Sequence, residues 1–221
     1  MKRGETRDLV ELYLNEQIEV NKQISRDKIV KIADLTWETY LGNGSVFVFA
    51  NGGGGAYAGN LACDFANHPF VSDDKSRPMD LGVRRLKAFD LTTSAENMTG
   101  IMNDLGPDYI FSQQLLNAGV RQGDLVYGFS GSGNSPNVLE AFKVARENGA
   151  KTISMTRGDG GKVKALSDIC LVVPGTSKFP GQIGGNDNNM HFEDACSYVT
   201  HIVTGILRKR VNDTYALEND K

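Results

Sequence analysis

The sequence lacks the long hydrophobic runs that membrane proteins need. Nowhere in its 221 residues do about 20 apolar residues follow one another, so no membrane span is expected. The first residues are charged and are not followed by the apolar core of a secretory signal. Cysteine is scarce, because only Cys63, Cys170 and Cys196 occur, far apart and without a CxxC pair. We therefore expect a cytoplasmic protein with reduced thiols.

A strong excess of charge is also missing. The formal net charge is −3, which argues against nucleic acid as a partner bound by bulk electrostatics. Apolar residues make up 40% and charged residues 23%, as is ordinary for a soluble globular protein. Without internal repeats or low-complexity linkers, we expect one domain over residues 1–221, large enough for a well-buried core.

Residues 1–40 are expected to form a helical extension of this domain. Apolar residues recur at helical spacing over residues 6–40, and the polar segment 21–26 predicts a break between two helices. Ser25 and Asp27 are candidate caps for the second helix. The apolar stripes are too rich for a lone surface helix, so they are expected to pack on the domain or on another subunit.

Strand-like and helix-like segments alternate through the rest of the chain. This alternation predicts a three-layer αβα sandwich, in which helices cover both faces of a five-stranded parallel sheet. The expected strands are 45–50, 86–91, 124–130, 151–156 and 169–174, separated by helical stretches near 56–68, 95–118, 134–148 and 160–167 and followed by a last helix over about 191–211.

A loop of glycine and serine follows the third predicted strand. Residues 130–135 read Ser-Gly-Ser-Gly-Asn-Ser, and helical spacing begins at Pro136. Glycines let the backbone approach an anion, while the N–H groups and dipole at a helix start favour its charge. Serine hydroxyls add hydrogen-bond donors. The loop therefore predicts a phosphorylated ligand.

A second glycine-rich loop, residues 51–55, follows the first predicted strand. On its own it is as typical of a tight packing turn as of a ligand loop. It is no Walker loop, because no GKS or GKT follows. Its G-x-G-x-x-A spacing would need an acidic residue about 20 positions on, at the end of the second strand. Asp73 and Asp74 have the distance but lie in an irregular segment, and Asp90 lies near the strand end but is too far along. We therefore expect no nucleotide cofactor. Both loops lie at carboxyl ends of strands, where one sugar phosphate could contact both.

Two pairs of polar residues lie on predicted helices. Asn60 and Asp64 are four residues apart and share a helix face, although an exposed polar face is an equally good explanation. Glu193 and His201 are eight residues apart, which is a rise of about 12 Å. They can serve one site only if their side chains converge, if the helix starts after Glu193, or if two subunits contribute. A histidine in an apolar stretch, such as His201, is more often structural than catalytic.

Together these motifs resemble sugar isomerase (SIS) domains. They read Ala50-Asn-Gly-Gly-Gly54, Asn103-Asp-Leu-Gly106, Ser130-Gly-Ser-Gly-Asn-Ser-Pro-Asn-Val138, Asp159-Gly-Gly-Lys162 and Glu193…His201, in the order found in that family. The set is similar, more narrowly, to phosphoheptose isomerases, which convert sedoheptulose 7-phosphate to a heptose 7-phosphate. The likeness covers roughly residues 7–211.

The resemblance implies a flavodoxin-like sheet and a homotetramer with active sites between subunits, in which 1–40 serves oligomerisation. It implies that a quartet of side chains, with which several family members bind zinc, lies at the reaction centre: Asn60, Asp64, Glu193 and His201. It also implies a substrate site made of Asn51, Gly52, Gly53, Asn103, Asp104, Glu193 and the phosphate-binding Ser130, Gly131, Ser132 and Ser135.

This sequence departs from the family pattern within the quartet. Asn60 replaces an imidazole, Asp64 is one methylene shorter than the usual Glu, and Glu193 replaces a neutral amide. Glycine also stands at positions 54 and 131, where hydroxyl side chains are common. We expect Asp64 to be the base and His201 the acid of an aldose–ketose isomerisation, with one zinc or other divalent ion as an option. The alternatives are a non-catalytic sugar-phosphate or protein-binding scaffold, and an isomerase for another sugar phosphate.

Overall fold

Five parallel strands form the centre of the molecule, which we analysed as a computed structural model that describes residues 3–71 and 82–215. The strand order is β2-β1-β3-β4-β5, the order of flavodoxin-like sheets. The strands are β1 (Ser45–Ala50), β2 (Lys87–Asp90), β3 (Leu125–Phe129), β4 (Lys151–Arg157) and β5 (Ile169–Val173). The predicted fold class is confirmed, and each strand lies where the apolar runs placed it.

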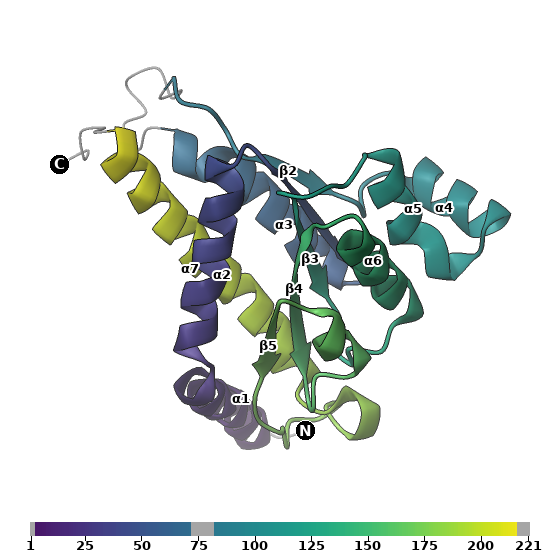
Figure 1. The fold of residues 1–221 in the computed structure, drawn as a ribbon. Helices are drawn as coiled ribbons and strands as arrows, with labels where there is room; N and C mark the ends of the chain where they lie inside the picture. The colour runs from purple at the N-terminus through teal and green to yellow at the C-terminus, as the bar shows by residue number, and fades with distance from the viewer. Residues whose placement is uncertain (1–2, 72–81, 216–221) are drawn as a thin grey trace.

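Helices cover both faces of the sheet (Figure 1). One layer contains α2 (Arg26–Leu41), α3 (Gly54–Asn67) and α7 (Asn189–Tyr215), and the other contains α4 (Ala95–Asp104), α5 (Ile110–Asn117) and α6 (Pro136–Glu147). Side chains alternate along β1, so that Val46 and Val48 belong to the core under the first layer and Phe47 and Phe49 to the core under the second. This alternation explains why the strand reads as a continuous apolar run.

Short 3-10 helices replace some of the expected α-helix. They are η1 (His68–Phe70), η2 (Pro107–Tyr109), η3 (Lys162–Leu166) and η4 (Gly184–Asn186). The expected helix 95–118 is divided because Gly106 has a φ of +103° and Pro107 follows it. The stretch 160–167 forms only η3, which follows Gly160 and Gly161 with φ values of +93° and +58°.

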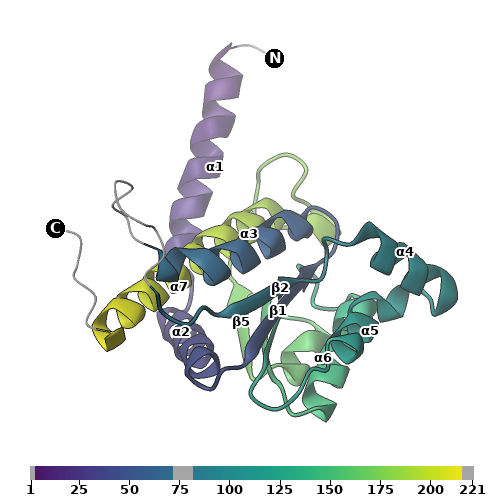
Figure 2. The same ribbon diagram turned by 90° about the horizontal axis from the view of Figure 1, so that it is seen from above.

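The first helix, α1 (Arg3–Gln23), stands away from the sheet and its two helical layers (Figure 2). The break after it was predicted correctly, since the Ser25 side chain caps α2 by accepting a hydrogen bond from Lys28 N. Three apolar side chains on α1 are about half exposed: Val10 (53%), Leu14 (58%) and Ile18 (50%). Among the helices of residues 3–71 and 82–215, none combines the length and the apolarity needed to cross a bilayer.

Candidate active site

The two glycine-rich loops begin side by side at the carboxyl edge of the sheet. In the parallel pairing of β1 with β3, Ala50 lies opposite Phe129. The next residues, Asn51 and Ser130, therefore leave neighbouring strands at the same level. This is the edge at which ligands bind in open parallel sheets. The expectation that both loops border one site agrees with this register.

The 130–135 loop is folded into a cup ahead of α6. Gly133 N donates to Ser130 O at 3.0 Å, and the Ser130 and Ser135 hydroxyl oxygens are 3.1 Å apart. Ser135 is the N-cap residue of α6, but its side chain makes no capping hydrogen bond. Its hydroxyl thus faces the loop, and the first turn of a 12-residue helix points its dipole toward the same place. Such an arrangement favours an anion.

A neighbouring turn supports the cup from outside. Asn134 Oδ1 accepts from Lys162 N at 3.1 Å, and Val163 N donates to Gly133 O at 2.9 Å. Gly133 has a φ of +64°, and a Cβ there would lie 2.1 Å from Gly160 O. The loop can therefore approach this turn only because position 133 is glycine. The sequence motif Asp159-Gly-Gly-Lys162 is explained by this support role.

The 51–53 loop is tied to the start of α6 by a reciprocal pair of amides. Asn51 Nδ2 donates to Asn137 Oδ1 at 3.0 Å, and Asn137 Nδ2 donates to Asn51 Oδ1 at 2.8 Å. Sequence reasoning missed Asn137, although it belongs to the Ser130–Val138 motif. Gly52 and Gly53 are exposed, and a Cβ at either position would meet no atom within 4 Å, so a ligand has room to approach their backbone.

The position of the Tyr57 side chain explains why residue 54, in the first turn of α3, is glycine. Its hydroxyl oxygen lies 2.8 Å from the position that a Cβ of Gly54 would take. The ring packs edge-on against Phe129, with the ring centroids 5.2 Å apart. Burial raises the pKa of Tyr57, and the nearby Glu193 carboxylate raises it further. The Tyr57 hydroxyl therefore keeps its proton and, beside Gly54, is a hydrogen-bond donor next to the 51–53 loop.

Three of the four predicted quartet residues meet where α3 passes α7. Asn60 Nδ2 donates to Asp64 Oδ2 at 3.2 Å and lies 3.2 Å from His201 Nε2. Asp64 Oδ2 is 3.6 Å from His201 Nε2, and the Asp64 side chain is only 13% exposed. The three side chains therefore form one polar group shared by two helices, and its role as a site stays a prediction.

A cavity of about 230 Å³ opens beside this group. It is lined by Asp64, His68, His201, Thr204, Gly205 and Arg208. His68 ends α3, and its Nε2 atom is 3.9 Å from Asp64 Oδ1. The carboxylate thus lies between two imidazoles, one of which, His68, was not among the predicted site residues.

The fourth quartet residue is engaged elsewhere. Glu193 Oε1 accepts from Asn189 Nδ2 at 2.8 Å. Because α7 runs without a break from Asn189, the option that the helix starts after Glu193 is wrong. One carboxylate, one imidazole and a neutral amide are a poor donor set for zinc. Within the described ranges, no three His, Cys, Asp or Glu side chains are placed to hold a metal ion, so these residues do not fit the zinc site that the resemblance implies.

Asn103 and Asp104 lie apart from the loops. Both are exposed at the end of α4, where Asn103 Nδ2 donates to Asp104 Oδ1 at 2.8 Å. In this part of the chain, no hydrogen bond between described residues connects them to the two loops. Their predicted contact with substrate stays a prediction, and it fits the implied arrangement in which a neighbouring subunit completes each site.

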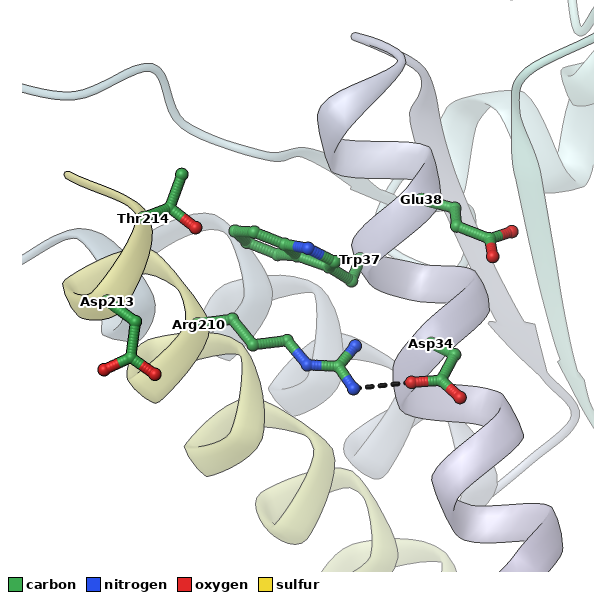
Figure 3. A pocket seen from close by; sticks show the side chains of 6 residues that line it. All are labelled: Asp34, Trp37, Glu38, Arg210, Asp213 and Thr214. Carbon is green, nitrogen blue, oxygen red and sulfur yellow. Dashed lines mark hydrogen bonds and ion pairs between the residues drawn. The ribbon is translucent and has the colours of Figure 1, made fainter.

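A second cavity lies between α2 and α7, away from both loops (Figure 3). It measures about 380 Å³ and is lined by Asp34, Trp37, Glu38, Arg210, Asp213 and Thr214. Arg210 Nη2 donates to Asp34 Oδ1 at 2.5 Å across it. None of the predicted site residues borders this cavity.

Comparison with known proteins agrees with this geometry. The SIS domain family matches residues 12–157. A phosphoheptose isomerase from Chlorobaculum parvum is 39% identical over 150 residues, 68% of each chain. Another, from Sulfurimonas denitrificans, is 29% identical over 208 residues, 90% of this chain and 95% of the relative. The solved phosphoheptose isomerase from Francisella tularensis shares the fold, with a TM-score of 0.77 at 23% identity over 95% of this chain and 100% of that one.

Proposed function

Because the chain belongs to the SIS domain family and, within it, to the phosphoheptose isomerases, we propose that it interconverts sedoheptulose 7-phosphate and D-glycero-D-manno-heptose 7-phosphate. One observation carries this proposal: Asp64 Oδ2 on α3 lies 3.6 Å from His201 Nε2 on α7. Helix α3 directly follows the 51–53 loop. A carboxylate beside an imidazole is a base and acid pair of the kind that aldose–ketose isomerisation requires.

In the proposed mechanism the phosphate rests in the 130–135 cup and the carbonyl end of the sugar reaches the pair on α3 and α7. Asp64 removes the proton from C1 of the ketose and returns it to C2, so that no proton is gained or lost. His201 protonates the C2 oxygen as the enediol forms and takes the proton from the C1 hydroxyl as it collapses. The Tyr57 hydroxyl and the Asn60 amide are placed to orient sugar hydroxyls.

The reaction is an internal transfer of hydrogen, so it needs no external hydride acceptor and no nucleotide cofactor. Since the donor set around Asn60 does not fit zinc, no step of the mechanism passes through a metal ion. Phosphate binding far from the reacting carbons contributes by positioning the sugar, because binding energy at the cup fixes the orientation at the pair.

We further propose that the protein works as a homotetramer in the cytoplasm. The apolar stripe of Val10, Leu14 and Ile18 lies on a helix that stands away from the body, which suits contact with another subunit. A neighbouring subunit would also bring residues such as Asn103 and Asp104 to a shared site.

The proposal is tested by incubating the protein with sedoheptulose 7-phosphate and following heptose 7-phosphate by NMR. We expect turnover by the native chain and a loss of about 10²–10⁴-fold in kcat for Asp64→Asn, with little change in substrate binding. Ser132→Ala, at the cup, should instead weaken binding. Tight binding without turnover by the native chain would favour the non-catalytic scaffold, and turnover of a different ketose phosphate alone would favour the third alternative.

A further inference from the structure

An arginine that has no acidic partner among the described residues lies against the 130–135 cup. Arg157 is the last residue of β4, and its backbone N donates to Gly131 O at 3.0 Å. The side chain of Arg157 lies next to the same residue: a Cβ at Gly131 would be 3.2 Å from Arg157 Nε. The absence of a side chain at position 131 therefore gives the guanidinium its place beside the loop.

The guanidinium is held by neutral acceptors. Arg157 Nε donates to Asn189 Oδ1 at 3.2 Å, and Nη2 donates to the carbonyl oxygen of Gly185. Over residues 3–71 and 82–215, no carboxylate lies within ion-pair distance of it, and Nη1 makes no hydrogen bond. Glu193, the acidic group linked to this network, bonds to the Asn189 amide and not to the arginine.

A half-buried arginine without a counterion is costly unless an anion joins it. Its planar fork matches the oxygens of a phosphate group, and charge-assisted hydrogen bonds of this type are stronger than those from neutral donors. The cup itself offers only hydroxyls, backbone N–H groups and a helix dipole. The positive charge of the nearby Arg157 guanidinium would therefore stabilise a dianionic phosphate bound in the cup.

We propose that Arg157 is a ligand of the substrate phosphate and sets the preference of this site for a phosphorylated over an unphosphorylated sugar. The inference rests on the proposed function for the identity of the sugar, but the anion contact itself can be tested apart from it. Arg157 is a binding and positioning residue in this proposal and takes no part in proton transfer.

The first test uses calorimetric titration with inorganic phosphate. We expect Arg157→Gln to weaken phosphate binding about ten- to a hundredfold and Arg157→Lys to weaken it less, because one charge-assisted hydrogen bond is lost or replaced. Arg146→Gln is the matched control, since Arg146 also donates to a carbonyl oxygen but lies in the last turn of α6, away from the cup. In kinetics, Arg157→Gln should raise KM for the sugar phosphate much more than it lowers kcat.

A second test needs no variant. Phenylglyoxal modifies exposed arginines, and mass spectrometry reports the modification of each one. Phosphate should protect Arg157 in the native protein and leave Arg146 unprotected. Equal phosphate binding by Arg157→Gln and the native chain, or modification of Arg157 that phosphate does not slow, would overturn the inference. Failure to turn over sedoheptulose 7-phosphate with protection intact would instead count against the proposed function alone.

Discussion

Asn60 places a neutral amide between a carboxylate and an imidazole. The amide nitrogen donates to Asp64 and lies 3.2 Å from His201 Nε2, so it orders both groups by hydrogen bonding. The nitrogen of an amide does not bind zinc, and its oxygen is a weak ligand compared with an imidazole. Asn60 is thus one of three quartet residues, with Asp64 and Glu193, at which this site departs from the zinc-binding arrangement that the family resemblance implies.

We predict that Asn60→His creates a zinc site. His68 faces the other carboxylate oxygen, Asp64 Oδ1. On the Oδ2 side, the variant would add an imidazole beside that of His201, giving with Asp64 three donors of the types found in zinc sites. Zinc titration followed by elemental analysis should show about one bound ion per chain, compared with none in the native protein, whose turnover should survive chelator treatment. Stoichiometric zinc in the native chain would contradict this account of Asn60.

At position 133, glycine is required twice over, for its backbone conformation and for the space that a side chain would occupy. Gly133→Ala should destabilise the protein by about 2–4 kcal/mol, because alanine disfavours positive φ and its Cβ would collide with the Gly160 backbone. Urea unfolding measures the loss. Gly158→Ala is the control: with a φ of +62° but nothing within 4 Å of a Cβ, it should cost only the conformational part. Equal costs would refute the steric argument.

At the scale of elements, one carboxylate joins the start of β4 to the start of β5. Asp168 Oδ1 accepts from Lys151 Nζ at 2.9 Å, while Oδ2 accepts from the backbone and side chain of Thr152, each at 2.9 Å. Partial burial opposes ionisation of Asp168, but these hydrogen bonds outweigh it and hold its pKa below the ordinary value of 3.8. The charged form therefore stabilises the fold.

The lowered pKa of Asp168 determines how the stability of the fold changes with pH. The folded-state pKa is lowered, so the stabilisation is complete above the unfolded-state pKa and is lost as the pH falls through the folded-state value. Asp168→Asn should reduce the free energy of unfolding by about 1–2 kcal/mol at neutral pH and by less in strong acid. Thermal unfolding from pH 7 to pH 2 checks it, and a constant difference between variant and native chain would contradict the assignment.

The positions of the elements could be predicted from the sequence because alternating apolar runs and helical stripes are local signals. Departures occur where glycine conformation decides, as at Gly106 and ahead of η3. The site was only partly predictable. The i and i+4 spacing of Asn60 and Asp64 shows a shared face, but their approach to His201 depends on how α3 packs on α7. Arg157 gave no signal, because its neighbour Gly131 is remote in sequence.

The whole molecule combines a sheet with two helical layers and one helix that leaves them. One face of α1 exposes the apolar stripe, while another face is fixed by polar contacts: Tyr13 donates to Asp194 Oδ2 at 2.6 Å, and Glu16 lies 3.1 Å from His191 Nε2. The direction of α1 is thereby set by the body, so that it presents the same stripe in every copy.

We predict that Leu14→Glu prevents assembly of the proposed tetramer. A charge in the middle of the stripe opposes burial of this surface against another subunit. Light scattering after size exclusion should report a smaller species for this variant. Asn15→Glu, which adds the same charge at the next exposed position, should leave the assembly intact. An unchanged mass for Leu14→Glu would exclude this face as a subunit contact.

The amide clasp between Asn51 and Asn137 has a consequence for the choice of sugar. Two hydrogen bonds hold the loop that leads into α3 against the start of α6. The distance between the 130–135 cup and the Asp64–His201 pair is then fixed. In the proposed mechanism, the carbonyl of a sugar phosphate one carbon shorter would fall short of the pair, and that of one carbon longer would extend beyond it. The enzyme would thus select its substrate by chain length before proton transfer.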